Sequence, residues 1–367
     1  MKQTKTRQKN NIIGLDGLRT LALIGVLLYH TFPFQIPGGY FGVILFFVLT
    51  GYLAGITMAK HYDGTLSSIL LYYKKRILRI YPQLLIVIFS TIGILFFIDK
   101  TYLVNADHET ASILLGYNNY WQLHMNADYF TKVTDNSPFT HFWYIAIQIQ
   151  FELIWPWLYA LFMLIKKKAG RNRMLLTAFG LTAVTALIMP VRAFMHTPAT
   201  VLYYDSFCRF YAILAGVSSG LLHKENRHLI FLHSKSGMKE LVYLFVFILV
   251  SIILYLKAPG SAMWVYEIGM FVYTLLCVCM VEVVSVENGA GRLLNLTPFR
   301  YISKYSYEIY LWQYPVLFVC GILQWSHTFG FYLLQIGIIV LLSIWLHTVT
   351  GMKPDIRNVL KRQPAKN

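Results

Sequence analysis

The chain has 367 residues, of which 57% are apolar types and 13% are charged, and its mean hydropathy is +0.53. A soluble domain carries about 25% charged residues, so this composition excludes a soluble globular protein, and the high apolar content also excludes a disordered one. Basic residues exceed acidic residues by 16, an imbalance that also occurs in proteins that bind nucleic acid.

Ten segments are long and apolar enough to cross a bilayer as helices, each of which needs about 20 mostly apolar residues. In chain order they are residues 14–34, 40–59, 80–98, 142–165, 174–191, 200–222, 240–257, 263–285, 302–324 and 329–350. The sequence therefore predicts an all-α integral membrane protein with about ten transmembrane helices.

The distribution of basic residues predicts how these helices are oriented. With the N-terminus in the cytoplasm, the inner segments hold 26 lysines and arginines and the outer segments hold 4. This asymmetry follows the positive-inside rule, so both termini are predicted to be cytoplasmic. The predicted parts are a basic N-terminal segment 1–12, a ten-helix membrane domain 13–351 with an extracellular loop 99–141, and a basic cytoplasmic tail 352–367.

The same distribution identifies the expected partners. Basic segments on the inner side suit anionic membrane lipids better than nucleic acid, so membrane lipids are predicted as partners and nucleic acid is not. Cys277 and Cys279 are two residues apart and point to different faces of a helix. No metal site is predicted.

The first span carries three ionisable residues, which are costly at membrane depth and are usually functional. Asp16 and Arg19 are three residues apart and can pair on a helix surface. Arg19 and His30 share a helical face about 16 Å apart along the axis. Two interpretations fit this pattern. The three residues form a polar, catalytic face of one helix, or Asp16 and Arg19 are an ion pair at the membrane interface and His30 is a buried packing residue.

Further charged residues lie at or within other spans. Arg76 and Arg79 are neighbours on one face at the cytoplasmic start of the third span, where guanidinium groups suit phosphate oxygens or anchor the helix at the lipid surface. Asp205 and Arg209 are spaced for an i,i+4 pair, and Glu152 and Glu308 lie inside spans. Each of these groups either forms a buried pair or lines a polar cavity.

Several of these residues belong to motifs that resemble the membrane-bound acyltransferase-3 family. The matching segments are residues 15–19 (LDGLR), 29–30 (YH), 37–43 (PGGYFGV), 46–52 (FFVLTGY), 76–82 (RILRIYP), 150–151 (QF), 155–156 (WP), 209–216 (RFYAILAG) and 306–312 (SYEIYLW) with Pro315. They follow the family order over nearly the whole chain. The chain departs from the family pattern at Gln148, which replaces a usual Glu, at Gln313, which replaces a frequent His, and at residues 350–354, where a frequent Glu-x-Pro is missing.

The resemblance implies a ten-span protein that transfers an acyl group across the membrane. The donor would be cytoplasmic acyl-CoA, here acetyl-CoA as co-substrate, and the acceptor a hydroxyl of an extracytoplasmic glycan or lipid. A bacterial plasma membrane and a cell-envelope glycan such as peptidoglycan or exopolysaccharide are the expected setting and acceptor. Arg19 and His30 would be the essential pair, and Arg76 and Arg79, together with Arg19, would bind coenzyme A.

A mechanism follows as a hypothesis. His30 acts as the general base on the acceptor hydroxyl, because an imidazole has an ordinary pKa of about 6.5. Glu152, one helical turn from Gln148, is predicted to orient His30, and Asp16 to support Arg19. An open passage from the arginines to His30 is expected.

Other parts of the chemistry stay open. Arg209 or Tyr144 would stabilise the oxyanion, and substrate contacts are predicted at Arg209, Trp143, Tyr144 and Gln148. Direct transfer and an acyl-enzyme relay both remain possible chemistries. The alternative functions are a glycan or lipid transporter without acyl transfer, and a scaffold for a separate acetyltransferase.

Overall fold

The computed structural model describes residues 14–58, 62, 64–125, 137–225, 238–286, 288–325 and 328–351. Within these ranges the chain forms helices and connecting turns and no strand. The predicted basic segment 1–12 and the predicted tail 352–367 lie outside the described residues. The helices are α1 (Leu15–Thr31), α2 (Gly42–Thr57), α3 (Leu66–Ile98), α4 (Ala106–Leu114), α5 (Asn118–His124), α6 (Trp143–Ala169), α7 (Arg171–Phe194), α8 (Ala199–Tyr204), α9 (Phe207–Lys224), α10 (Met238–Lys257), α11 (Met270–Ser285), α12 (Gly289–Leu294), α13 (Thr297–Lys304), α14 (Ser306–Ile322) and α15 (Phe329–Gly351).

The membrane-protein class is confirmed by the helices themselves. Seven helical segments of the described chain are long and apolar enough to cross a bilayer, and they correspond to seven of the ten predicted spans. The other three predicted spans contain α1, α9 and α14, which have 17, 18 and 17 residues. These three helices carry many of the polar residues singled out in the sequence. The total of ten crossings stays a prediction.

One predicted span, residues 200–222, is divided in the structure. The helix α8 ends at Tyr204, and α9 begins at Phe207. Between them the Asp205 carboxylate accepts a 2.7 Å hydrogen bond from the backbone N–H of Phe207. An aspartate in this position satisfies one of the free N–H groups of a helix start, and it therefore initiates a new helix.

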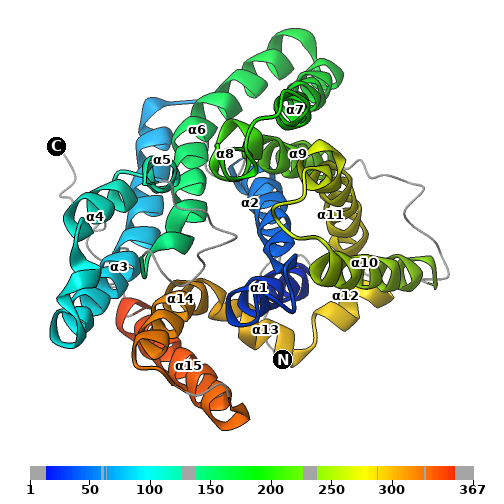
Figure 1. Cartoon of the computed structure of the whole chain (residues 1–367). Coiled ribbons are helices and arrows are strands. Elements are labelled where there is room, and N and C mark those ends of the chain that lie inside the picture. The colour runs from blue at the N-terminus through cyan, green and yellow to red at the C-terminus, as the bar shows by residue number, and fades with distance from the viewer. Residues whose placement is uncertain are drawn as a thin grey trace, which may run out of the picture.

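The helix α2 lies at the centre of the bundle, with α14 and α15 on one side and α10 and α11 on the other (Figure 1). It packs closely against α9 because glycines on the two helices face each other. A Cβ atom at Gly51 would lie 1.8 Å from the carbonyl oxygen of Ile213, and one at Gly216 would lie 2.1 Å from that of Val48. Small residues spaced four apart allow this close approach of helix backbones inside a membrane.

The outer helices present apolar side chains away from the bundle. In the most apolar stretch of α2, 78% of the residues are buried, whereas in α15 the share is 17%. Helices whose apolar side chains stay uncovered need a non-aqueous surrounding, because such a surface would aggregate in water. This gradient places α2 in the protein core and α15 at the lipid boundary.

The segment between α3 and α6, predicted as an extracellular loop, contains α4 and α5. The side chain of Glu109 on α4 is buried and accepts hydrogen bonds from Ser137 Oγ (2.5 Å) and Gln122 Nε2 (3.0 Å). Burial raises the pKa of Glu109 from 4.5 to about 7, although both hydrogen bonds act to lower it. Asn119 on α5 donates to the carbonyl oxygen of Tyr204 (2.9 Å), so these short helices are fixed on the bundle.

Candidate functional site

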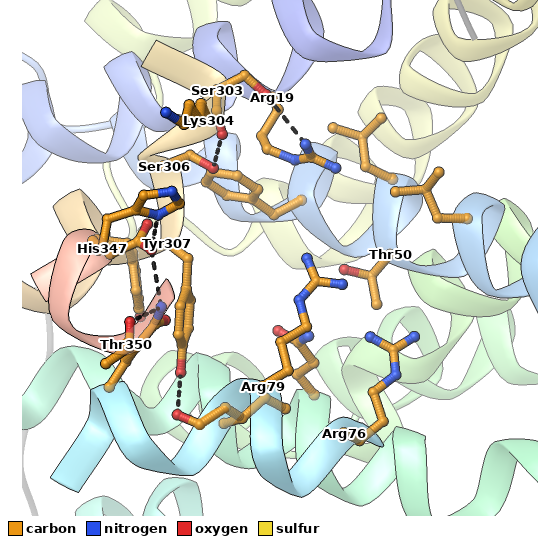
Figure 2. Close-up of a pocket in the computed structure, with 18 of the residues that line it drawn as sticks. Arg19, Thr50, Arg76, Arg79, Ser303, Lys304, Ser306, Tyr307, His347 and Thr350 are labelled. Carbon is orange, nitrogen blue, oxygen red and sulfur yellow. Dashed lines mark hydrogen bonds and ion pairs between the residues drawn. The ribbon is translucent and has the colours of Figure 1, made fainter. Parts of the chain in front are cut away.

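A cavity of about 820 Å³ opens among the ends of several helices, within the size range of small-molecule sites. Figure 2 shows residues from its walls. Its lining comes from the start of α1, from α2, α3 and α6, and from α13, α14 and α15. Polar and charged lining residues include Asp16, Arg19, Thr50, Arg76, Arg79, Gln83, Tyr144, Gln148, Arg300, Ser303, Lys304, Ser306, Tyr307, Glu308, Tyr310, His347 and Thr350.

The lining of this cavity is strongly basic. It contains four arginines and one lysine against two carboxylates, those of Asp16 and Glu308. The guanidinium groups of Arg19, Arg76 and Arg79 converge near Thr50 (Figure 2). Such a concentration of planar, permanently charged donors suits phosphate groups. The structure therefore brings together all three arginines that the sequence assigned to coenzyme A.

Arg19 is held from two sides. Its Nη1 atom lies 3.4 Å from Asp16 Oδ1 and donates to Ser303 Oγ at 3.2 Å. Ser303 Oγ in turn donates to Asp16 Oδ1 at 2.7 Å, so α13 completes the local pair on α1. The contact between Asp16 and Arg19 agrees with the pairing that their spacing predicts.

Arg76 and Arg79 differ in how they are held. Arg76 Nη1 lies 3.2 Å from Glu152 Oε1, which also accepts a 3.2 Å hydrogen bond from Gln148 Nε2. The Arg76 guanidinium lies 5.2 Å from the centroid of the Tyr72 ring. Arg79 makes no hydrogen bond or ion pair with the residues that the structure describes, and its guanidinium extends into the cavity (Figure 2).

His30 is buried at the other end of α1. The residue is 5% exposed, and its Nδ1 atom lies 2.9 Å from Oε1 and 2.6 Å from Nε2 of Gln313 on α14. The ring contacts Tyr314 and His141, with centroid distances of 5.0 and 6.4 Å. Gln313, one of the departures from the family pattern, is therefore a hydrogen-bond partner of this histidine.

The cavity does not reach His30. It ends at Tyr144 and Tyr310, whose ring centroids are 5.5 Å apart. Behind Tyr310 lies the ring of His141, at 5.2 Å, and His141 in turn contacts His30. The open passage expected from the sequence is thus closed in this conformation by a layer of aromatic rings.

Glu152 lies far from the residue it was expected to orient. It is on α6, eleven residues beyond His141, which corresponds to about 16 Å along a helix. The contact that it makes instead is with Arg76. Its carboxylate therefore pairs with an arginine of the cavity wall without lining the cavity itself, and its predicted catalytic role stays a prediction.

Arg209 and Trp143 lie outside the cavity lining. Arg209 is buried, and its Nε atom donates to the carbonyl oxygen of Tyr203 at 2.8 Å. Its guanidinium lies over the rings of Tyr203 and Trp143, at 4.5 and 5.9 Å. The predicted pair of Arg209 with Asp205 does not form, because Asp205 precedes α9 and instead pairs with Arg192.

The structure also reveals a polar group that the sequence analysis missed. His347 on α15 has its Nδ1 atom 2.7 Å from Glu308 Oε1, and Gln83 Nε2 donates to the same oxygen at 2.9 Å. His347 and Glu308 both line the cavity. A lone histidine in an otherwise apolar span was the available signal, since polar residues at membrane depth are usually functional.

The chain thus has the architecture of a polytopic helical membrane protein with a cavity lined by basic residues, and sequence comparison identifies its class. Residues 12–348 match the sequence model of a family described as an acyltransferase domain. The chain belongs to this acyltransferase family.

Three relatives from bacteria carry more specific names. YrhL of Bacillus subtilis, named as a candidate peptidoglycan O-acetyltransferase, is 28% identical over 85% of this chain and 50% of its own length. The O-acetyltransferase OatA of Staphylococcus aureus is 26% identical over 83% of this chain and 50% of its own length. The peptidoglycan O-acetyltransferase OatA of Listeria monocytogenes is 27% identical over 86% and 51%.

This chain therefore spans about half the length of the curated relatives that it matches. No solved structure matches it. Among the described residues, no group of three or more histidines, cysteines, aspartates or glutamates is arranged to hold a metal ion.

Proposed function

We propose that this protein transfers an acetyl group from acetyl-CoA to a hydroxyl of a cell-wall glycan such as peptidoglycan, across the plasma membrane. The observation that carries the proposal is the cavity where Arg19, Arg76 and Arg79 converge. Coenzyme A is anionic at its nucleotide end, so this cavity would hold its phosphates on the cytoplasmic side. The names of the bacterial relatives favour a cell-wall acceptor.

His30 would act as the general base of the reaction. Both polar atoms of the Gln313 amide lie near His30 Nδ1, Oε1 at 2.9 Å and Nε2 at 2.6 Å. The proposed reaction uses the tautomer in which Nδ1–H donates to Gln313 Oε1, because Nε2 is then the basic nitrogen. The acceptor oxygen would attack the thioester carbon while its proton moves to Nε2. As the C–S bond breaks, the proton would pass from the imidazolium to the departing sulfur, which gives an ester and free coenzyme A.

Acetyl-CoA binding and acetyl transfer should be separable by mutation. Arg79→Gln should weaken binding of acetyl-CoA at least tenfold, because a charge-assisted contact to phosphate is worth about 1.5–3 kcal/mol. His30→Ala should bind acetyl-CoA normally and lose transfer to peptidoglycan fragments. Arg171→Gln, an arginine outside this cavity with an ion-pair distance of 4.0 Å to Glu225, is the matched control.

The measurement uses the full chain in lipid nanodiscs, with acetyl-labelled acetyl-CoA and peptidoglycan fragments. Label that enters the glycan supports an enzyme, whereas intact glycan without label would support the transporter alternative. Unchanged acetyl-CoA affinity in the Arg79→Gln variant would contradict the assignment of the cavity to the donor.

A further inference from the structure

His141 is a second buried histidine beside His30, and its ring nitrogens lack a hydrogen-bond partner within the described part of the chain. It lies in a 3-10 turn (Thr140–Phe142) directly before α6 and is 1% exposed. Neither of its ring nitrogens has a hydrogen-bond partner among the residues that the structure describes. The backbone of Tyr310 and Leu311 runs close to the ring without hydrogen-bond geometry to either nitrogen.

Packing does not explain a histidine at this position. Its ring lies against Phe142 at 4.1 Å and against Tyr314 at 5.1 Å, and these contacts would suit any aromatic ring. A buried polar group without a partner destabilises the fold by about 1–3 kcal/mol. A phenylalanine would make the same contacts without that penalty, so the imidazole calls for a partner beyond the residues that the structure describes.

The location of His141 indicates what that partner is. Its ring contacts Tyr310, which lines the cavity, and it contacts His30 on the other side. Tyr314 packs against both imidazoles, at 5.0 and 5.1 Å. The hydroxyl of Tyr310 also donates a hydrogen bond to the backbone oxygen of His141, which ties this turn to the cavity wall. Two imidazoles therefore flank the position that lies next beyond the end of the cavity.

We propose that His141 is a second catalytic imidazole, which stabilises the oxyanion while His30 takes the proton. The inference rests on the proposed acetyl transfer. The acceptor oxygen forms the new C–O bond, and the carbonyl oxygen gains negative charge. The N–H of His141 donates to this oxygen. When the carbonyl re-forms, the C–S bond breaks, and the sulfur receives the proton that His30 removed from the acceptor.

The test compares His141→Phe with His141→Gln in the full chain, in nanodiscs, with labelled acetyl-CoA and peptidoglycan fragments. His141→Phe should unfold at or above the wild-type temperature and bind acetyl-CoA with wild-type affinity. Its transfer rate should fall by about 100-fold or more, the loss seen when one oxyanion donor is removed. His141→Gln keeps an N–H donor and should recover part of that rate.

Each other outcome overturns the inference. Wild-type transfer by His141→Phe would leave the proposed function intact and remove His141 from the chemistry. Loss of folding in both variants would assign His141 a packing role. A wild-type protein that binds acetyl-CoA and transfers no label would overturn the proposed function and this inference with it.

Discussion

Replacing Glu152 with Gln should strengthen the binding of acetyl-CoA. The carboxylate of Glu152 lies 3.2 Å from Arg76 Nη1 and is almost fully buried, so it offsets part of the positive charge that the cavity presents. A glutamine keeps an oxygen at the same position, which can still accept the hydrogen bonds from Arg76 and Gln148. The substitution therefore removes the charge and leaves the geometry of the arginine in place.

The expected gain follows from the distances. A phosphate on the cavity side of Arg76 would lie about 8 Å from the Glu152 carboxylate, and at an effective dielectric constant of about 20 two unit charges at that distance repel by about 2 kcal/mol. Mobile ions in the cavity screen this repulsion to about 1 kcal/mol, because the Debye length of about 10 Å is close to the separation. That difference corresponds to about a fivefold decrease in the dissociation constant.

The assay is isothermal titration of the purified protein with acetyl-CoA, at two salt concentrations. Asp205→Asn removes the carboxylate that pairs with Arg192, outside the cavity, and should leave the affinity unchanged. The gain in the Glu152→Gln variant should shrink at high salt, because the effect is electrostatic. An unchanged dissociation constant together with a large loss of transfer rate would refute this reasoning and return Glu152 to the chemistry at His30.

Two further predictions concern the fold. Gly51→Ala should lower the unfolding temperature of the detergent-solubilised protein strongly, because its Cβ would overlap a backbone oxygen of α9, whereas Gly180→Ala, with nothing within 4 Å, should be neutral or slightly stabilising. Equal effects of the two substitutions would contradict the close packing of α2 and α9. Glu109, whose pKa is raised from 4.5 to about 7, binds more protons in the folded state, so stability should fall by about 3 kcal/mol as pH rises across that interval. Glu109→Gln should abolish this pH dependence in hydrogen exchange of α4 and α5, and a dependence that persists would assign it to another group.

Features that depend on neighbouring residues could be predicted from the sequence. The long apolar helices follow from local hydropathy, and the contact of Asp16 with Arg19 follows from a spacing of three. The break before α9 was missed, although Asp205 followed by Ser206 is a typical helix start. The hydropathy pattern does not reveal the end of one helix and the start of the next at this cap, because the residues on both sides of it are apolar.

Contacts between distant helices could not be predicted in the same way. The pairs of Arg76 with Glu152 and of His347 with Glu308 join helices whose relative rotation and depth are set by packing. A single sequence does not show the relative rotation and depth of two helices, so these pairs could not be predicted from it. The two family departures at Gln148 and Gln313 were visible, but their partners, Glu152 and His30, became clear only from the side-chain contacts.

The proposed acetyl transfer requires the closed layer between the cavity and His30 to open. Tyr144 and Tyr310 form the end of the cavity wall with their side chains, so we expect the opening to be a local movement of these rings. The hydrogen bond from Tyr310 to the backbone of His141 would break, which costs about 0.5–1.5 kcal/mol net. Under the proposed function, charge-assisted contacts of an anionic nucleotide with three arginines, worth about 1.5–3 kcal/mol each, would exceed that cost. A layer that opens only when the donor is bound would also keep the two sides of the membrane separated in its absence.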